Sequence, residues 1–198
     1  MNGRGFFYGL LFAGLLAAPV AALAASDQPY VNLFGGNTFF GPGSHLDGGG
    51  TLGLRVGQRL GQHLGIEWQV ASAFARLQDQ NKTSANQYSG SVIGNYYAFS
   101  GASSPYLSLG LGASSDLFNQ QTGRGTSVMG IFGLGYEQRL GDHFGLRLGL
   151  QDQLLFDTPQ PQGGALNNIQ VTGGISYFWG GNDNTRAFPI IAPTRSEP

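Results

Sequence analysis

Three histidines, with the serine and carboxylate side chains near them, are the residues that could form a catalytic nucleophile and its base. The histidines are His45, His63 and His143, and the chain has no cysteine, which excludes thiol catalysis and thiolate metal sites. A set of His45, Ser115 and Asp116 could carry out acyl transfer or lipid hydrolysis. However, their spacing matches no deacylase or palmitoyl-transferase motif, and no His, Asp and Glu cluster has metal-ligand spacing. We therefore expect no catalytic residue, no metal and no cofactor.

Six charged residues form a second set, because they fall on the polar side of segments that alternate between apolar and polar residues. They are Arg55, Arg59, Glu67, Glu137, Arg139 and Arg147. Across one hairpin Arg55 would face Glu67, and we predict an ion pair between them. Across a second hairpin we predict a pair between Glu137 and Arg147. If the polar side is enclosed, these charges form one cluster that serves either as a plug or as a gated ion path.

The first 24 residues have the features of a cleaved secretory signal peptide. Arg4 precedes an apolar stretch that runs from Phe6 to about Ala18, and Ala22 and Ala24 are small residues at the positions that signal peptidase reads. The apolar run is shorter than the roughly 20 residues that a membrane-spanning helix needs. We expect cleavage after Ala24.

The composition of the remaining chain does not suit a surface in contact with water. Charged residues make up 11% of the sequence, against roughly 25% in an ordinary soluble domain, and Lys82 is the single lysine. The exterior must therefore face something other than water over much of its area. Because no later apolar stretch could form a spanning helix, a closed β-barrel is the structure that satisfies every backbone hydrogen bond in a membrane. The net charge of -1 provides no basic patch for nucleic acid.

Eight segments show the alternating pattern of strands with one polar face. They are expected at 29–40, 49–60, 63–77, 86–99, 105–118, 126–140, 143–156 and 167–179. Short turns at 61–62, 100–104 and 141–142 alternate with longer polar connections. This alternation is typical of outer-membrane barrels, whose short turns are periplasmic. The sequence therefore predicts an all-β, antiparallel, up-and-down transmembrane barrel over 25–179 with about eight strands and both termini in the periplasm.

One turn sequence occurs twice, 80 residues apart. Residues 58–66 read QRLGQHLGI, and residues 138–146 read QRLGDHFGL. In an eight-stranded ring this offset corresponds to four strands, so the two copies would lie on opposite sides of the barrel. Either a duplicated half or independent convergence on one turn chemistry would explain the repeat.

Two motifs near the end of the chain carry a family resemblance. Residues 136–147 read YEQRLGDHFGLR, and the last segment has Thr172, Gly174, Tyr177 and Trp179 in the order polar, glycine, aromatic, aromatic. The first motif resembles the strand–turn–strand units of small outer-membrane barrels of the outer membrane protein A and outer membrane protein X type. The second resembles the signal that such proteins present to the barrel-assembly machinery. A tail at 180–198 departs from this family pattern, and we expect it to be a disordered periplasmic tail.

The resemblance implies contact with outer-membrane lipid and lipopolysaccharide, and a non-enzymatic role in envelope integrity or in presenting loops to surface partners. Aromatic residues on the apolar face would form the girdle at the membrane interfaces. These are Trp68, Tyr96, Tyr136, Tyr177 and Trp179. Three alternatives stay open: a lipid A-modifying barrel enzyme, a narrow ion channel, and a soluble lipocalin-like binder with its apolar face turned inward.

Overall fold

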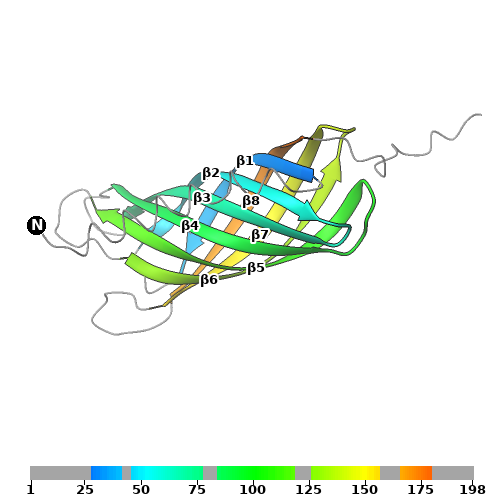
Figure 1. The fold of residues 1–198 in the computed structure, drawn as a ribbon. Helices are drawn as coiled ribbons and strands as arrows, with labels where there is room; N and C mark the ends of the chain where they lie inside the picture. The colour runs from blue at the N-terminus through cyan, green and yellow to red at the C-terminus, as the bar shows by residue number, and fades with distance from the viewer. Residues whose placement is uncertain (1–27, 42–45, 78–83, 119–125, 157–165, 180–198) are drawn as a thin grey trace, which may run out of the picture.

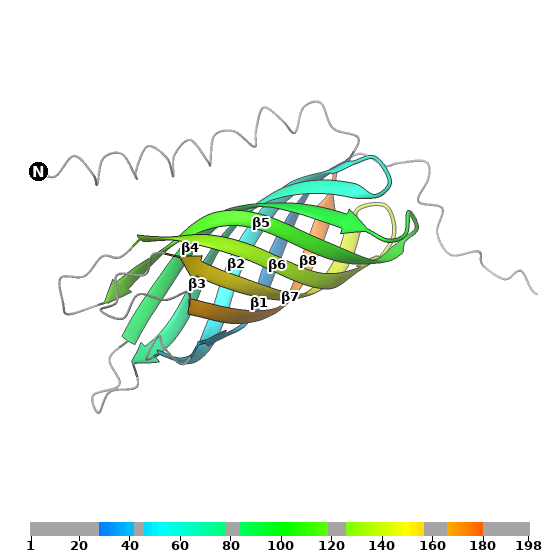
Figure 2. The ribbon, with the colours of Figure 1, turned by 90° about the horizontal axis from the view of Figure 1, so that it is seen from below.

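The computed structural model describes residues 28–41, 46–77, 84–118, 126–156 and 166–179, which form a closed antiparallel barrel. Its eight strands are β1 (Gln28–Phe40), β2 (Leu46–Leu60), β3 (Leu64–Leu77), β4 (Ser84–Tyr97), β5 (Ser103–Phe118), β6 (Thr126–Arg139), β7 (Phe144–Phe156) and β8 (Leu166–Phe178). Figures 1 and 2 show the strands running obliquely around the barrel. Each strand pairs with the next, and β8 pairs with β1. The predicted fold class is confirmed.

Within the described segments, no helix is long and apolar enough to cross a membrane.

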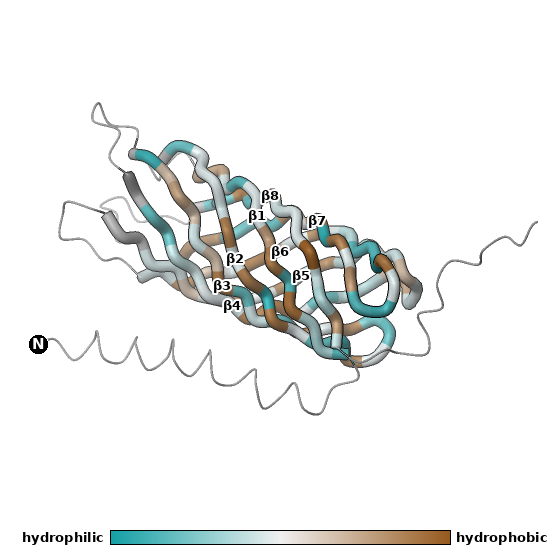
Figure 3. Tube along the Cα trace, turned by 90° about the horizontal axis from the view of Figure 1, so that it is seen from above, coloured by the Kyte–Doolittle hydropathy of each residue, from teal (hydrophilic) through white to brown (hydrophobic). Residues whose placement is uncertain are grey.

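Side chains alternate between the interior and the exterior of the barrel along the strands. Figure 3 shows the matching alternation of apolar and polar residues along the chain trace. On β7, Leu146 and Leu148 are exposed on the outside, whereas Arg147 and Gln151 are buried inside. The interior holds mostly polar and charged side chains, and the exterior presents leucine, isoleucine, valine and aromatic residues. This arrangement is the reverse of the one that a soluble lipocalin-type barrel requires.

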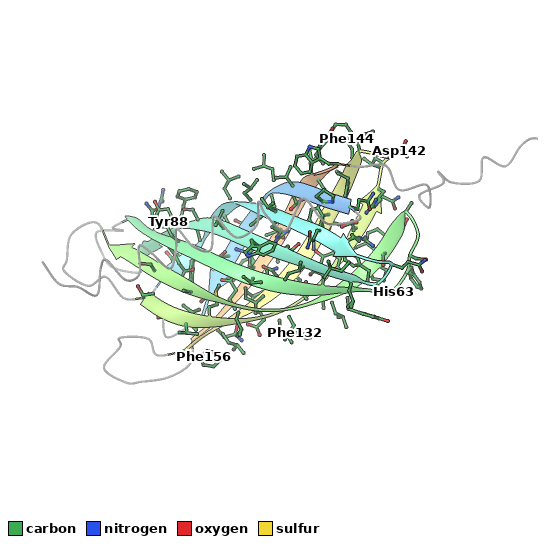
Figure 4. All side chains as sticks on the ribbon, in the orientation of Figure 1. His63, Tyr88, Phe132, Asp142, Phe144 and Phe156 are labelled. Carbon is green, nitrogen blue, oxygen red and sulfur yellow. The ribbon has the colours of Figure 1, made fainter. Side chains whose placement is uncertain are left out.

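Short turns join β2 to β3, β4 to β5 and β6 to β7 at one end of the barrel. Figure 4 shows His63 and Asp142 at this end, with Tyr88 and Phe156 near the other. Gly61 and Gly141 open two of the turns with φ values of 81° and 95°. Residues with a side chain rarely adopt such values, so the repeated glycine is required by the turn geometry.

The two copies of the repeated sequence make a matching backbone contact on opposite sides of the barrel. The backbone carbonyl of His63 accepts a hydrogen bond from the Tyr97 amide at 2.7 Å, and that of His143 accepts one from the Phe178 amide at 2.8 Å. β2 and β6 are four strands apart in a ring of eight, as are β3 and β7. The repeat therefore places the same turn on opposite sides of the barrel.

Candidate functional site

A first group of paired charges, which we call the middle triad, consists of Arg55, Glu67 and Arg147. Arg147 Nη1 donates a hydrogen bond to Glu67 Oε2 at 2.7 Å, and Arg55 Nε lies 3.8 Å from Glu67 Oε1. The Tyr30 hydroxyl also donates to Glu67 Oε2, at 2.7 Å. All four side chains point into the lumen and are buried there. The free-energy cost of burying the Glu67 carboxylate is therefore offset by the two arginines and by the neutral hydroxyl donor.

A second group, the turn-side triad, consists of Arg59, Glu137 and Arg139. Arg59 Nη2 donates to Glu137 Oε1 at 2.6 Å, and Arg139 Nε lies 3.6 Å from the same oxygen. Arg139 is the last residue of β6, and Arg59 is the residue before the last of β2, so this triad lies next to the short turns. Glu137 Oε2 also accepts a long hydrogen bond of 3.5 Å from the Tyr97 hydroxyl.

The shortest ion pairs of both triads cross the lumen. Glu67 and Arg147 lie on β3 and β7, and Arg59 and Glu137 lie on β2 and β6, so each pair joins strands on opposite walls. An amide contact follows the same route, because Gln69 on β3 donates to Gln151 on β7 at 3.4 Å. The interior of an eight-stranded barrel is just wide enough for side chains to fill, and these pairs span it from wall to wall.

This geometry corrects the predicted Glu137–Arg147 pair. The two residues are direct partners in the β6–β7 register, yet Arg147 pairs with Glu67 and Glu137 pairs with Arg59. The alternation of a strand fixes which face a side chain takes but not its direction within the lumen. Because the lumen is narrow and arginine is long, a carboxylate on the opposite wall is within reach. The predicted neighbours Arg55 and Glu67 do lie together, at 3.8 Å.

Each buried arginine also lies over the face of an aromatic ring. The stacked pairs are Arg55 on Phe34, Arg59 on Tyr97, Arg139 on Phe178 and Arg147 on Tyr106, at 3.9, 3.5, 4.1 and 4.4 Å from the guanidinium carbon to the ring centroid. Cation–π attraction is stronger in a desolvated site than in water. The rings therefore stabilise four buried cations, which the two carboxylates alone do not balance.

Glycines opposite these rings provide the space that the rings occupy. A Cβ atom on Gly135 would lie 2.3 Å from Tyr106 Cζ, and one on Gly53 would lie 2.3 Å from Phe34 Cζ. Each glycine is the direct cross-strand neighbour of the aromatic residue. Packing an aromatic ring over a cross-strand glycine is a known device for fixing strand register.

The inward-pointing aromatic residues are the members of the site that the sequence pattern did not identify. Tyr30, Tyr97, Tyr106, Phe34 and Phe178 are almost completely buried. The alternation of the strands could have identified them, because each lies an even number of residues from a polar residue of its own strand that points inward.

The predicted girdle residues all lie on the outward face. Tyr96, Tyr136, Tyr177 and Trp179 lie toward the turn end, where Tyr177 and Trp179 pack edge to face at 5.2 Å. Trp68 is partly buried on the same face but pairs with Val92, further from the turns than Tyr96.

The proposed assembly motif divides between the two faces of β8. Thr172 is buried in the lumen, where its hydroxyl accepts a long hydrogen bond of 3.4 Å from Arg55 Nη2. Gly174 also faces inward, since a Cβ atom there would lie 2.9 Å from the Asn32 side chain. Tyr177 and Trp179 face outward.

No catalytic arrangement forms among the residues that the structure describes. His45 and the side chain of Asp116 lie outside them, and Ser115 is partly exposed near the end of β5. His63 and His143 lie at the turn end, away from Ser115. In the same part of the chain, no group of three or more His, Asp and Glu residues could hold a metal ion.

A closed barrel with an apolar exterior and an ion-paired polar interior defines a small transmembrane β-barrel protein. The chain belongs to the outer membrane protein beta-barrel domain family, whose sequence model matches residues 9–182. The protein is therefore an outer-membrane β-barrel. No curated protein sequence matches it.

Several solved structures share the fold at low sequence identity. Neisserial surface protein A is 11% identical, with a TM-score of 0.57 over 77% of this chain and 97% of that chain. OprG from Pseudomonas aeruginosa is 14% identical, with a TM-score of 0.54 over 78% and 97%. Ail from Yersinia pestis, in complex with the heparin analogue sucrose octasulfate, is 13% identical, with a TM-score of 0.54 over 77% and 97%. These neighbours are small eight-stranded outer-membrane barrels.

Proposed function

We propose that this protein is a non-enzymatic structural or surface-interaction barrel, with a lumen plugged by its two charge triads. The observation that supports this proposal most strongly is the pair of ion pairs across the lumen. Glu67 with Arg147 and Arg59 with Glu137 join opposite walls at 2.7 and 2.6 Å, and stacked aromatic rings surround them. A lumen filled in this way supports a rigid anchor, and any recognition is then left to the connections between strands at the end opposite the turns.

The placement in the envelope is part of the proposal. The signal peptide 1–24 directs export, the short turns and both termini lie in the periplasm, and 180–198 is a periplasmic tail. Thr172, Gly174, Tyr177 and Trp179 present the last strand to the barrel-assembly machinery. The outward aromatic residues contact lipid and lipopolysaccharide at the membrane interfaces. The barrel then serves envelope integrity or holds loops for a surface partner.

Conductance in planar bilayers tests the plug. We expect the purified barrel to give no stepwise conductance. The double variant Glu67→Gln with Glu137→Gln should give ion flux, because the arginines lose the carboxylates that hold them across the lumen. Arg76→Gln is the matched control, since Arg76 is exposed near the end of β3. Steady channels in the unaltered protein would contradict the plug. A change in the mass of lipid A after incubation with purified lipopolysaccharide would contradict the absence of enzymatic activity.

A further inference from the structure

We infer that the turn-side triad binds a small monovalent anion of the halide class. The triad combines the guanidinium groups of Arg59 and Arg139 with the single carboxylate of Glu137, so its formal charge is positive. Both arginines approach the same oxygen, Glu137 Oε1, at 2.6 and 3.6 Å. This site does not depend on whether the barrel conducts ions or what its loops bind.

The excess of positive charge extends to the whole described interior. Four arginines and two glutamates point into the lumen there. Of the other charged side chains that the structure describes, Asp47, Arg76 and Asp142 are exposed and Asp152 lies on the outward face of β7. Arginine does not lose its proton in proteins, so the lumen cannot discharge this excess by titration. A bound anion would supply the missing negative charge.

Unpartnered donors mark where the anion would bind. Arg59 Nε and Arg139 Nη1 are buried and have no hydrogen-bond partner. A guanidinium group has no acceptor atom, so these positions can be satisfied only by a group that accepts hydrogen bonds. The rings of Tyr97 and Phe178 stack on the two guanidinium groups and hold them in place beside Glu137. Fixed donors around an excess positive charge form a site for an anion.

The middle triad also has one unpartnered donor, Arg147 Nε, but neutral acceptors already surround its other arginine. Arg55 Nε donates to Gln69 Oε1 at 2.7 Å, and its terminal nitrogens donate to Asn32 Oδ1 at 3.3 Å and Thr172 Oγ1 at 3.4 Å. The turn-side triad is also nearer to the end of the barrel, since Arg59 is the residue before the last of β2, Arg139 is the last residue of β6, and both strands end at short turns. A halide would therefore reach it from the turn end of the barrel.

Thermal unfolding at constant ionic strength tests this site. The folded barrel in detergent micelles is unfolded while sodium gluconate is replaced stepwise by sodium bromide. We expect the unfolding midpoint to rise with bromide, because a ligand that binds the folded state stabilises it. In Arg139→Gln the rise should disappear. In Glu137→Gln it should appear at a bromide concentration on the order of tenfold lower, because a competing negative charge has been removed.

The opposite signs of these two variants separate an anion site from a purely structural cluster. If the triad were only structural, each variant would shift the midpoint by an amount that does not change with the bromide concentration. Arg76→Gln, outside the lumen, should keep the bromide dependence of the unaltered protein. A bromide anomalous signal beside Arg59 and Arg139 in crystals is the second expected result. A bromide-independent midpoint in the unaltered protein, or the same dependence in Arg139→Gln, would overturn the inference.

Discussion

The stability of the barrel should depend on the ion pair between Arg147 and Glu67 far more than on any interaction between Arg147 and Glu137. Double-mutant cycles measure these two couplings directly. For Arg147→Gln with Glu67→Gln we expect a coupling free energy of about 3 kcal/mol. For Arg147→Gln with Glu137→Gln we expect less than about 1 kcal/mol, the range of an ordinary cross-strand pair, although these residues are register partners.

The larger value follows from the geometry of the middle triad. Arg147 Nη1 lies 2.7 Å from Glu67 Oε2, and both side chains are buried. With charge centres about 4 Å apart and an effective dielectric constant of about 20, the Coulomb attraction is roughly 4 kcal/mol. Arg55 at 3.8 Å and the Tyr30 hydroxyl at 2.7 Å continue to compensate the carboxylate when Arg147 is removed. Their presence reduces the expected coupling to about 3 kcal/mol.

Urea unfolding of the barrel in phospholipid vesicles is a suitable assay, and tryptophan fluorescence can follow it. Trp68 and Trp179 are on the outward face, so they report the loss of the lipid environment. A cycle of Glu67→Gln with Arg76→Gln is the control and should be additive within about 0.5 kcal/mol. A stronger coupling of Arg147 to Glu137 than to Glu67 would refute the cross-lumen arrangement.

The same unfolding assay checks the packing of the lumen and the position of the membrane. Gly135→Ala should destabilise the barrel by about 2 kcal/mol, because the new Cβ atom would lie 2.3 Å from the Tyr106 ring. Gly50→Ala, with nothing within 4 Å of the added atom, should change stability by less than about 0.5 kcal/mol. On the outward face, Leu150→Arg, at the centre of β7, should cost about 2–4 kcal/mol and Leu140→Arg, beside a turn, no more than about 1 kcal/mol. Equal costs at the two leucines would contradict a membrane position centred on the strands.

The fold could be predicted because the period-two pattern acts on every strand separately. Leu146 and Arg147, for example, take opposite faces of β7 for local reasons, and eight such segments leave a closed barrel as the consistent solution. Partner choice inside the lumen could not be predicted in the same way. Whether Arg147 turns toward Glu137 or Glu67 depends on distances across the barrel and on neighbouring rings, which no local pattern contains.

Aromatic residues illustrate a second limit of the sequence pattern. Tyrosines are expected at the membrane interface, and Tyr96 does lie outside, but its neighbour Tyr97 is completely buried. Residue type alone does not distinguish the two, whereas alternation does: Tyr97 has the parity of the inward residue Asn95. For Trp68 the alternation of the strand predicts the face correctly, but it does not predict the position of the residue along the barrel axis.

Heat-modifiable mobility of the protein in the outer-membrane fraction tests the membrane barrel most directly. The fraction is extracted in mild detergent and run on a denaturing gel with and without boiling. A closed barrel held by strand pairing around its full circumference should resist the detergent and migrate differently until it is boiled. Recovery of the protein in the soluble periplasmic fraction, with one mobility before and after boiling, would contradict a barrel that faces lipid on its apolar side.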